Sequence, residues 1–235
     1  MTLLFIRRRG EWLMRQLIFK ELYMQRFQFV VYIILSGFAF GFDMKSQNGF
    51  LISCILLSIF AMYTSLRIDE RNNSDRILNS LPLLRKHVVI AKYISFILLI
   101  LISVCITVFV SFCFYVIGQF DRVVAGYYPL FGSAIPWNLA IVGFGVTLLY
   151  AILLLPIVFT FGGKIATYAS MILPIIIMIL NRHILPQILN VLTFVQHVLG
   201  NIPKWTLWGI GIFLLGLLTS TSISVSIQCY QRRDL

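Results

Sequence analysis

The chain has 235 residues, of which 60% are hydrophobic and only 11% are charged, and its formal net charge is +11. Soluble domains contain about 25% charged residues, and disordered chains are poor in hydrophobic residues, so the composition excludes both classes. It predicts an all-α, polytopic membrane protein with a single transmembrane domain over residues 1–235.

Six apolar runs are candidates for membrane-spanning helices, each of which needs about 20 residues. In chain order they are 27–42, 49–66, 88–118, 137–161, 165–180 and 205–228. The first and fifth runs are short. We expect the first to gain length from residues 22–24 and the fifth to continue into an irregular outer segment.

The segment before the first span, residues 1–26, is mixed in polarity. Its stretch 9–26 predicts a helix along the inner membrane interface, because Lys and Arg stems can lie on apolar surface. The alternative is a cytosolic helix packed on the bundle.

The basic residues predict the orientation of the bundle. Six spans put both chain ends on one side of the membrane. If that side is the cytoplasm, the outer Lys and Arg residues number only four of 19, namely Lys45, Arg122, Arg182 and Lys204. Loops rich in Lys and Arg stay in the cytoplasm, so both termini are predicted to be cytoplasmic. The positive-inside topology then explains the positive charge, and we expect membrane lipids but no nucleic acid as partners.

The inner connection 67–87 is long and charged, and it predicts a short helix that couples to a partner protein. Asn73 or Ser74 can cap the first turn, and a proline ends the helix by restricting the residue before it. Its apolar face would fit a groove on the partner, and a lid folded onto the membrane surface is the alternative. The residues expected at this contact are Asp75, Ile77, Leu78, Leu81, Pro82 and Arg85.

The outer connection 181–204 contains a second amphipathic stretch, residues 184–200. It is too short to cross a bilayer, so it predicts a re-entrant or interfacial helix on the outer side. A seventh span is the alternative.

Small and polar residues in the spans predict where helices or subunits meet. Gly37 and Gly41 lie one turn apart and allow close approach of a second helix, so we expect them at a helix contact or a dimer seam. The polar residues expected near this seam, along a substrate path, are Ser36, Ser53, Ser58 and Thr64.

The six predicted spans contain no Asp and no Glu. Ionisable residues inside a membrane mark ion paths, proton relays and catalytic centres. We therefore expect no catalytic residue, no metal site and no cofactor bound by this chain. A path without charge suits an amphipathic peptide or a lipid better than a small polar solute.

Two stretches resemble a known family. Residues 79–93 read NSLPLLRKHVVIAKY, similar to the SLP-x-x-RK-x-V-x-AKY stretch of ABC transporter permeases of the type-2 export class. Residues 155–164 read LPIVFTFGGK, similar to the P-x-x-F-x-FG stretch before that family's fifth span. The chain departs from the pattern at Leu84, where many relatives carry a small polar residue that can cap the third span. Within the family it most resembles permeases of bacterial peptide-toxin exporters, including those for phenol-soluble modulins.

The resemblance implies a permease subunit in a bacterial plasma membrane that pairs with a second permease subunit, the same chain or a paralogue. Separate cytoplasmic ABC ATPase subunits would bind ATP and Mg and drive export of an amphipathic peptide or lipidic substrate. The chain itself would not be an enzyme. The alternatives are a membrane-embedded enzyme acting on lipid or peptide, and a scaffold or sensor subunit without transport.

Overall fold

The computed structural model describes residues 15–41, 48–72, 74, 85–120, 137–162, 164–174 and 204–232. Regular structure in these ranges is entirely helical, which agrees with the predicted all-α class. Several predictions fall outside the described residues: the start of the N-terminal segment, residues 75–84 of the inner connection, and the outer helix 184–200.

The chain begins with a helix over residues 15–24, which leads through the short 3-10 helix η1 (Arg26–Gln28) into α2 (Phe29–Phe40). The helices that follow are α3 (Asn48–Arg71), α5 (Arg85–Phe120), α8 (Trp137–Phe161), a helix over residues 164–174, and α10 (Lys204–Arg232).

Five of the described helices are long and apolar enough to cross a membrane, and each overlaps a predicted span. They are Arg15–Phe40, Gly49–Arg71, Arg85–Phe120, Trp137–Phe161 and Gly211–Arg232. For the remaining span, predicted over 165–180, the structure describes only the helix 164–174. A multi-pass membrane protein is therefore confirmed, and the sixth crossing stays a prediction.

α8 shows how the sequence sets the ends of a span. It covers the same residues as the predicted helix, beginning at Trp137, a residue type that favours the membrane interface. It ends before Gly162, whose φ of 86° is a conformation that glycine adopts without steric cost. The chain then turns directly into residues 164–174.

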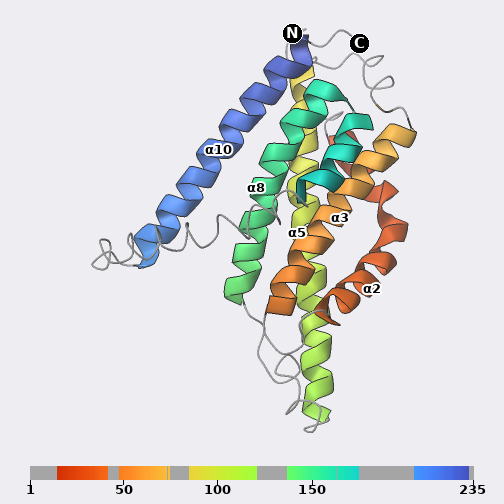
Figure 1. The fold of residues 1–235 in the computed structure, drawn as a ribbon, viewed down its shortest axis with the longest axis vertical. Helices are drawn as coiled ribbons and strands as arrows, with labels where there is room; N and C mark the ends of the chain where they lie inside the picture. The colour runs from red at the N-terminus through yellow and green to blue at the C-terminus, as the bar shows by residue number, and fades with distance from the viewer. Residues whose placement is uncertain are drawn as a thin grey trace, which may run out of the picture.

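The long helices form one bundle in which α3 packs against α2, α5 and α8, and α10 packs against α8 and α5. α3, α8 and α10 end, and α5 begins, at the same end of the bundle (Figure 1). We call this the Arg85 end. α2 and α5 both run away from it, and α5 extends beyond the other long helices at the far end (Figure 1).

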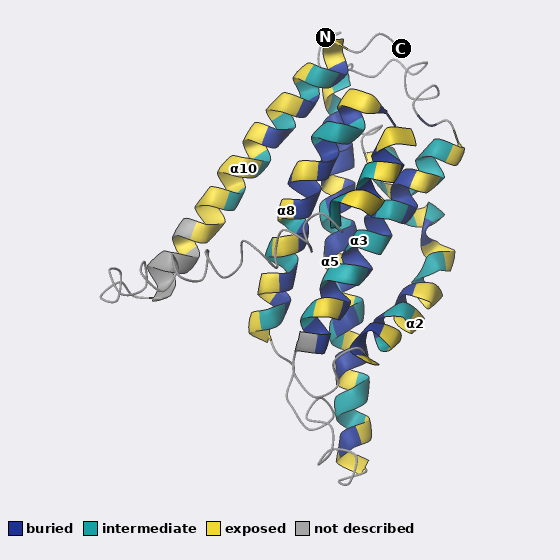
Figure 2. Ribbon diagram, viewed as in Figure 1, coloured by how far each residue is buried: buried dark blue, intermediate teal, exposed yellow. Residues whose placement is uncertain are grey.

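The core lies where α3, α5 and α8 meet, and it includes Met62, Phe96 and Leu154. α10 diverges from this core toward its first residues, and most of its residues between 211 and 218 are exposed (Figure 2). Ile212 and Phe213, for example, are 68% and 66% exposed.

Among the described glycines tested for space, Gly143 of α8 has the tightest surroundings. A Cβ atom at this position would lie 2.8 Å from the sulfur and 3.2 Å from the Cβ of Cys54 on α3, so a larger residue would force the Cys54 side chain or the two helices to shift. Gly37, which the sequence analysis selected, has no atom within 4 Å of such a Cβ. Gly37 therefore makes no close helix contact within the described part of the subunit, and its role at a dimer seam stays a prediction.

Candidate functional site

Charged side chains from three helices meet in a buried cluster near the Arg85 end. The Lys92 amine of α5 donates a hydrogen bond to Glu21 Oε1 at 2.8 Å and another to the Asp69 carboxylate of α3. It also donates to Ser65 Oγ at 3.3 Å. We call these four residues the Lys92 cluster. The side chains of Lys92, Glu21 and Asp69 are only 10%, 14% and 23% exposed.

Breaking a buried ion pair leaves an uncompensated charge and is strongly unfavourable. The Lys92 cluster therefore holds the helix 15–24 against α3 and α5. Gln25 strengthens the same attachment, since its buried amide donates to the Ala61 carbonyl at 3.3 Å. The described part of the N-terminal segment thus contacts the bundle through this face, and whether it also lies along the membrane interface stays a prediction.

The Lys92 cluster lies at the border of the predicted spans, since Glu21 precedes the span 27–42 and Asp69 follows the span 49–66, and the prediction of spans without acidic residues stays a prediction. Lys92 lies inside the predicted span 88–118, and both carboxylates belong to helices that are long and apolar enough to span. The paired residues are 71 and 23 positions apart, so no local pattern connects them. The sequence did contain one indication of an ion pair, namely Lys92 within an apolar run. Charged residues in such runs are almost always paired.

The start of the segment 75–84 is attached to the same region. Ser74 is buried and accepts a hydrogen bond from the Lys20 amine at 3.4 Å. Ser74 directly precedes the segment 75–84, and Lys20 directly precedes Glu21 of the Lys92 cluster. The hydrogen bond therefore links the residue before the segment to the helix 15–24. Of the predicted coupling residues, Asp75, Ile77, Leu78, Leu81 and Pro82 lie outside the described residues.

The end of that segment is attached to a different helix. Arg85, the first residue of α5, donates hydrogen bonds to the carbonyl oxygens of Tyr230 and Gln231, both at 3.0 Å. The last carbonyls of a helix lack partners within the helix, and a cation there also compensates the helix dipole. Arg85 therefore stabilises the end of α10. The Tyr230 ring in turn packs edge-on against Phe159 of α8, with 5.3 Å between ring centroids.

The helix 164–174 joins the Arg85 end through polar contacts. Thr167 donates to Glu70 Oε2 of α3 at 3.0 Å, and the Tyr150 hydroxyl of α8 donates to the Ser170 carbonyl at 2.9 Å. These two contacts connect the helix 164–174 to α3 and α8 by hydrogen bonds.

The residues predicted to lie along a substrate path are buried at the contact between α2 and α3 or within α3. The Ser36 and Ser53 hydroxyls share a hydrogen bond of 2.9 Å, and Ser58 donates to the Cys54 carbonyl at 2.8 Å. Thr64 shares a 2.8 Å hydrogen bond with the Tyr32 hydroxyl of α2. These contacts explain the burial of all four side chains, and their contact with a substrate stays a prediction.

The hydroxyl groups of α10 divide into two sets. Tyr93 of α5 shares hydrogen bonds with Ser222 at 2.6 Å and Ser226 at 2.9 Å, and Ser222 also contacts the Ile152 carbonyl of α8 at 2.8 Å. The hydroxyls that bond instead to carbonyls of their own helix belong to Thr219, Ser220, Thr221 and Ser224. The first set fixes the last third of α10 to two neighbouring helices.

The chemistry of the Lys92 cluster is that of a structural connection. Every buried side-chain nitrogen and oxygen in the described ranges has a hydrogen-bond partner. Those ranges also contain no group of three or more His, Cys, Asp or Glu side chains that could hold a metal ion.

Comparison with known proteins identifies the family. The family described as ABC-2 family transporter protein matches residues 16–231, from the helix that carries Glu21 to the end of α10. No curated protein and no solved structure matches the chain. The match covers almost the whole bundle and agrees with its several apolar helices. The chain therefore belongs to the ABC-2 family of transporter proteins and is the membrane permease component of an ABC transporter.

Proposed function

We propose that this permease exports an amphipathic peptide or a lipidic substrate together with a second permease subunit, and that cytoplasmic ATPase subunits act on it through residues 75–85. Membership of the ABC-2 family implies an ATPase partner. The observation that carries the proposal is that the two described residues flanking 75–84 are both hydrogen-bonded to other helices. Ser74 bonds to the helix 15–24, and Arg85 bonds to the end of α10.

A segment attached in this way passes its movement to the rest of the subunit. A displacement at Ser74 acts on the helix 15–24, which is joined to α3 and α5 by the Lys92 cluster. A displacement at Arg85 acts on α10 and, through Tyr230, on α8. Separating a buried ion pair costs about 3–5 kcal/mol. The three helices at the Lys92 cluster are therefore expected to move together.

The composition of the outer part of the bundle supports the proposed substrate class. Beyond Lys92, α5 contains no charged residue up to Phe120, and α8 contains none at all. A charged solute would have no counter-ion along these helices, and an unpaired charge in hydrocarbon is costly. An amphipathic substrate can keep its polar groups in water while its apolar face contacts the helices.

A search of the neighbouring reading frames for an ABC ATPase, followed by co-expression of that ATPase with the permease, tests the proposal. We expect the two proteins to purify together, and we expect inside-out vesicles to take up a fluorescent amphipathic peptide only with ATP. A labelled sugar of similar size should stay outside. Arg85→Ala should lower peptide uptake per ATP hydrolysed, whereas Arg67→Ala, at an exposed position on α3, should not. Absence of a stable ATPase partner, or efficient uptake of the sugar, would contradict the proposal.

A further inference from the structure

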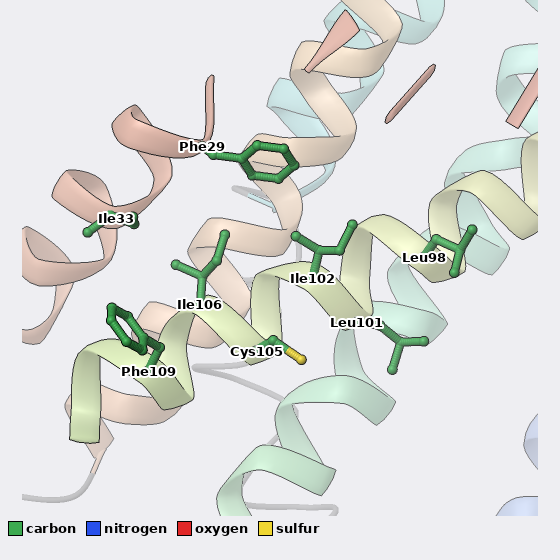
Figure 3. Close-up of a pocket in the computed structure, with 8 residues that line it drawn as sticks. All are labelled: Phe29, Ile33, Leu98, Leu101, Ile102, Cys105, Ile106 and Phe109. Atoms are coloured by element: carbon green, nitrogen blue, oxygen red, sulfur yellow. The ribbon is translucent and has the colours of Figure 1, made fainter. Parts of the chain in front are cut away.

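An apolar groove of about 410 Å³ lies between α2 and α5, on the outer surface of the bundle (Figure 3). Phe29 and Ile33 line it from α2, and side chains between Leu98 and Phe109 line it from α5. Apart from the thiol of Cys105, the lining side chains are hydrocarbon. Ile33 is 43% exposed and Phe109 is 58% exposed, so the groove is open to the surroundings of the bundle.

The length of the groove matches one leaflet of a bilayer. The eleven residue steps from Leu98 to Phe109 span about 16 Å along a helix. The hydrocarbon core is about 30 Å thick, so one leaflet supplies about 15 Å. A stretch of this length accommodates one acyl chain along one leaflet.

Arg26 of η1 lies at about the level of one end of the groove, by position along the helices. Phe40 at the end of α2 packs on Phe114 of α5, with 5.4 Å between ring centroids. The two helices run in the same direction (Figure 1). Arg26 precedes Phe40 by fourteen positions, or about 21 Å of helix, which places it level with about residue 100 of α5. This is the end of the groove marked by Leu98, nearer the Arg85 end.

The Arg26 side chain is exposed and oriented by two aromatic rings. Its guanidinium carbon lies 4.1 Å from the centroid of Tyr23 and 4.5 Å from that of Phe27. Both rings are largely exposed themselves, at 62% and 75%. Among the described residues, Arg26 forms no ion pair with a carboxylate. Exposed aromatic rings with a basic residue are typical of the headgroup level of a membrane.

We propose that this groove and Arg26 together bind one anionic phospholipid of the surrounding bilayer. One acyl chain lies between α2 and α5, and the phosphate contacts the Arg26 guanidinium, which can form two parallel hydrogen bonds to phosphate oxygens. Lipid binding at this groove does not depend on which substrate the permease carries.

The test uses the full-length permease with its partner subunits in lipid nanodiscs that contain photoreactive phosphatidylglycerol or photoreactive phosphatidylcholine. After illumination, mass spectrometry maps the lipid adducts. We expect phosphatidylglycerol adducts to concentrate on 29–33 and 98–109, at least about fivefold above those on 211–218 of α10. The α10 segment is apolar and more exposed than the groove, so it reports ordinary boundary lipid.

Two substitutions separate the headgroup contact from the chain contact. Arg26→Gln should lower phosphatidylglycerol adducts in the groove about fivefold and leave phosphatidylcholine adducts unchanged, while Arg26→Lys should retain most of them. Arg67→Gln, which removes another exposed cation, is the control. Leu101→Trp should fill the groove and lower adducts of both lipids, whereas Leu214→Trp on α10 should not.

Three results would overturn the proposal. Adducts spread evenly over the groove and 211–218 would mean boundary lipid only. Unchanged phosphatidylglycerol labelling in a folded Arg26→Gln variant would remove the headgroup contact. A photoreactive residue at Leu101 that captures a second permease chain instead of lipid would make the groove a subunit interface.

Discussion

Replacing Lys92 by methionine removes the cation that contacts both Glu21 and Asp69 while keeping an unbranched side chain of similar length. The two carboxylates then remain in a site where their side chains are only 14% and 23% exposed. Leaving a buried charge without its partner costs about 3–5 kcal/mol, and we expect Lys92→Met to lower the free energy of unfolding by this amount. Glu21→Gln keeps the pair between Lys92 and Asp69, so its cost is smaller, about 1.5–3 kcal/mol.

Titration with SDS from mixed micelles, followed by tryptophan fluorescence, measures both free energies of unfolding. Arg67→Met is the control, since Arg67 is exposed and its loss should change stability by no more than about 0.5 kcal/mol. The double variant Glu21→Gln with Lys92→Met should cost less than the sum of the two single variants, because both remove the same contact. A change below about 1 kcal/mol for Lys92→Met, which is the effect of an exposed ion pair, would refute the buried-cluster reasoning.

Gly143→Ala is expected to lower the free energy of unfolding by about 1–3 kcal/mol in the same titration, because its Cβ would lie 2.8 Å from the Cys54 sulfur. Gly37→Ala, with open space around it, should be neutral, and equal effects at the two positions would contradict the assigned packing. Ile77→Asp with Leu81→Asp is expected to abolish co-purification of the ATPase, because charges would replace the apolar face, while the permease still elutes as a folded protein. Full retention of the ATPase by this variant would show that the segment is not the docking contact.

Hydropathy predicted the helices well because the bilayer constrains their length and composition. α8 begins and ends at the predicted residues, since an interfacial tryptophan precedes its apolar run and Gly162 permits the turn that follows it. The length of α5 was less predictable. It continues from Arg85 to Phe120, beyond the apolar run on both sides, because helix-forming polar residues can extend a span into water.

The partners of individual side chains were not predictable in the same way. Hydropathy identifies Lys92 as unusual, but only the packing of three helices brings Glu21 and Asp69 to it. The spacing of two glycines one turn apart selected Gly37. The glycine in close contact is instead Gly143, and the neighbour that limits its size is Cys54 on another helix. The sequence identified polar residues such as Ser53 in the spans. It did not show which neighbouring helix each of these residues would face.

The hydrogen bonds of α10 to its neighbours lie in its last third, and they determine which movements of this helix meet little resistance. The hydrogen bonds from Tyr93 to Ser222 and Ser226, with Arg85 at the final carbonyls, resist sliding along the axis because each requires a fixed register. They resist rotation about that point much less. Gly211 lies eleven residues from Ser222, or about 16 Å, so a tilt of about 10° at the hydrogen bonds would displace it by about 3 Å. α10 therefore has the geometry of a lever whose short arm lies at the Arg85 end and whose long arm runs away from that end through Gly211.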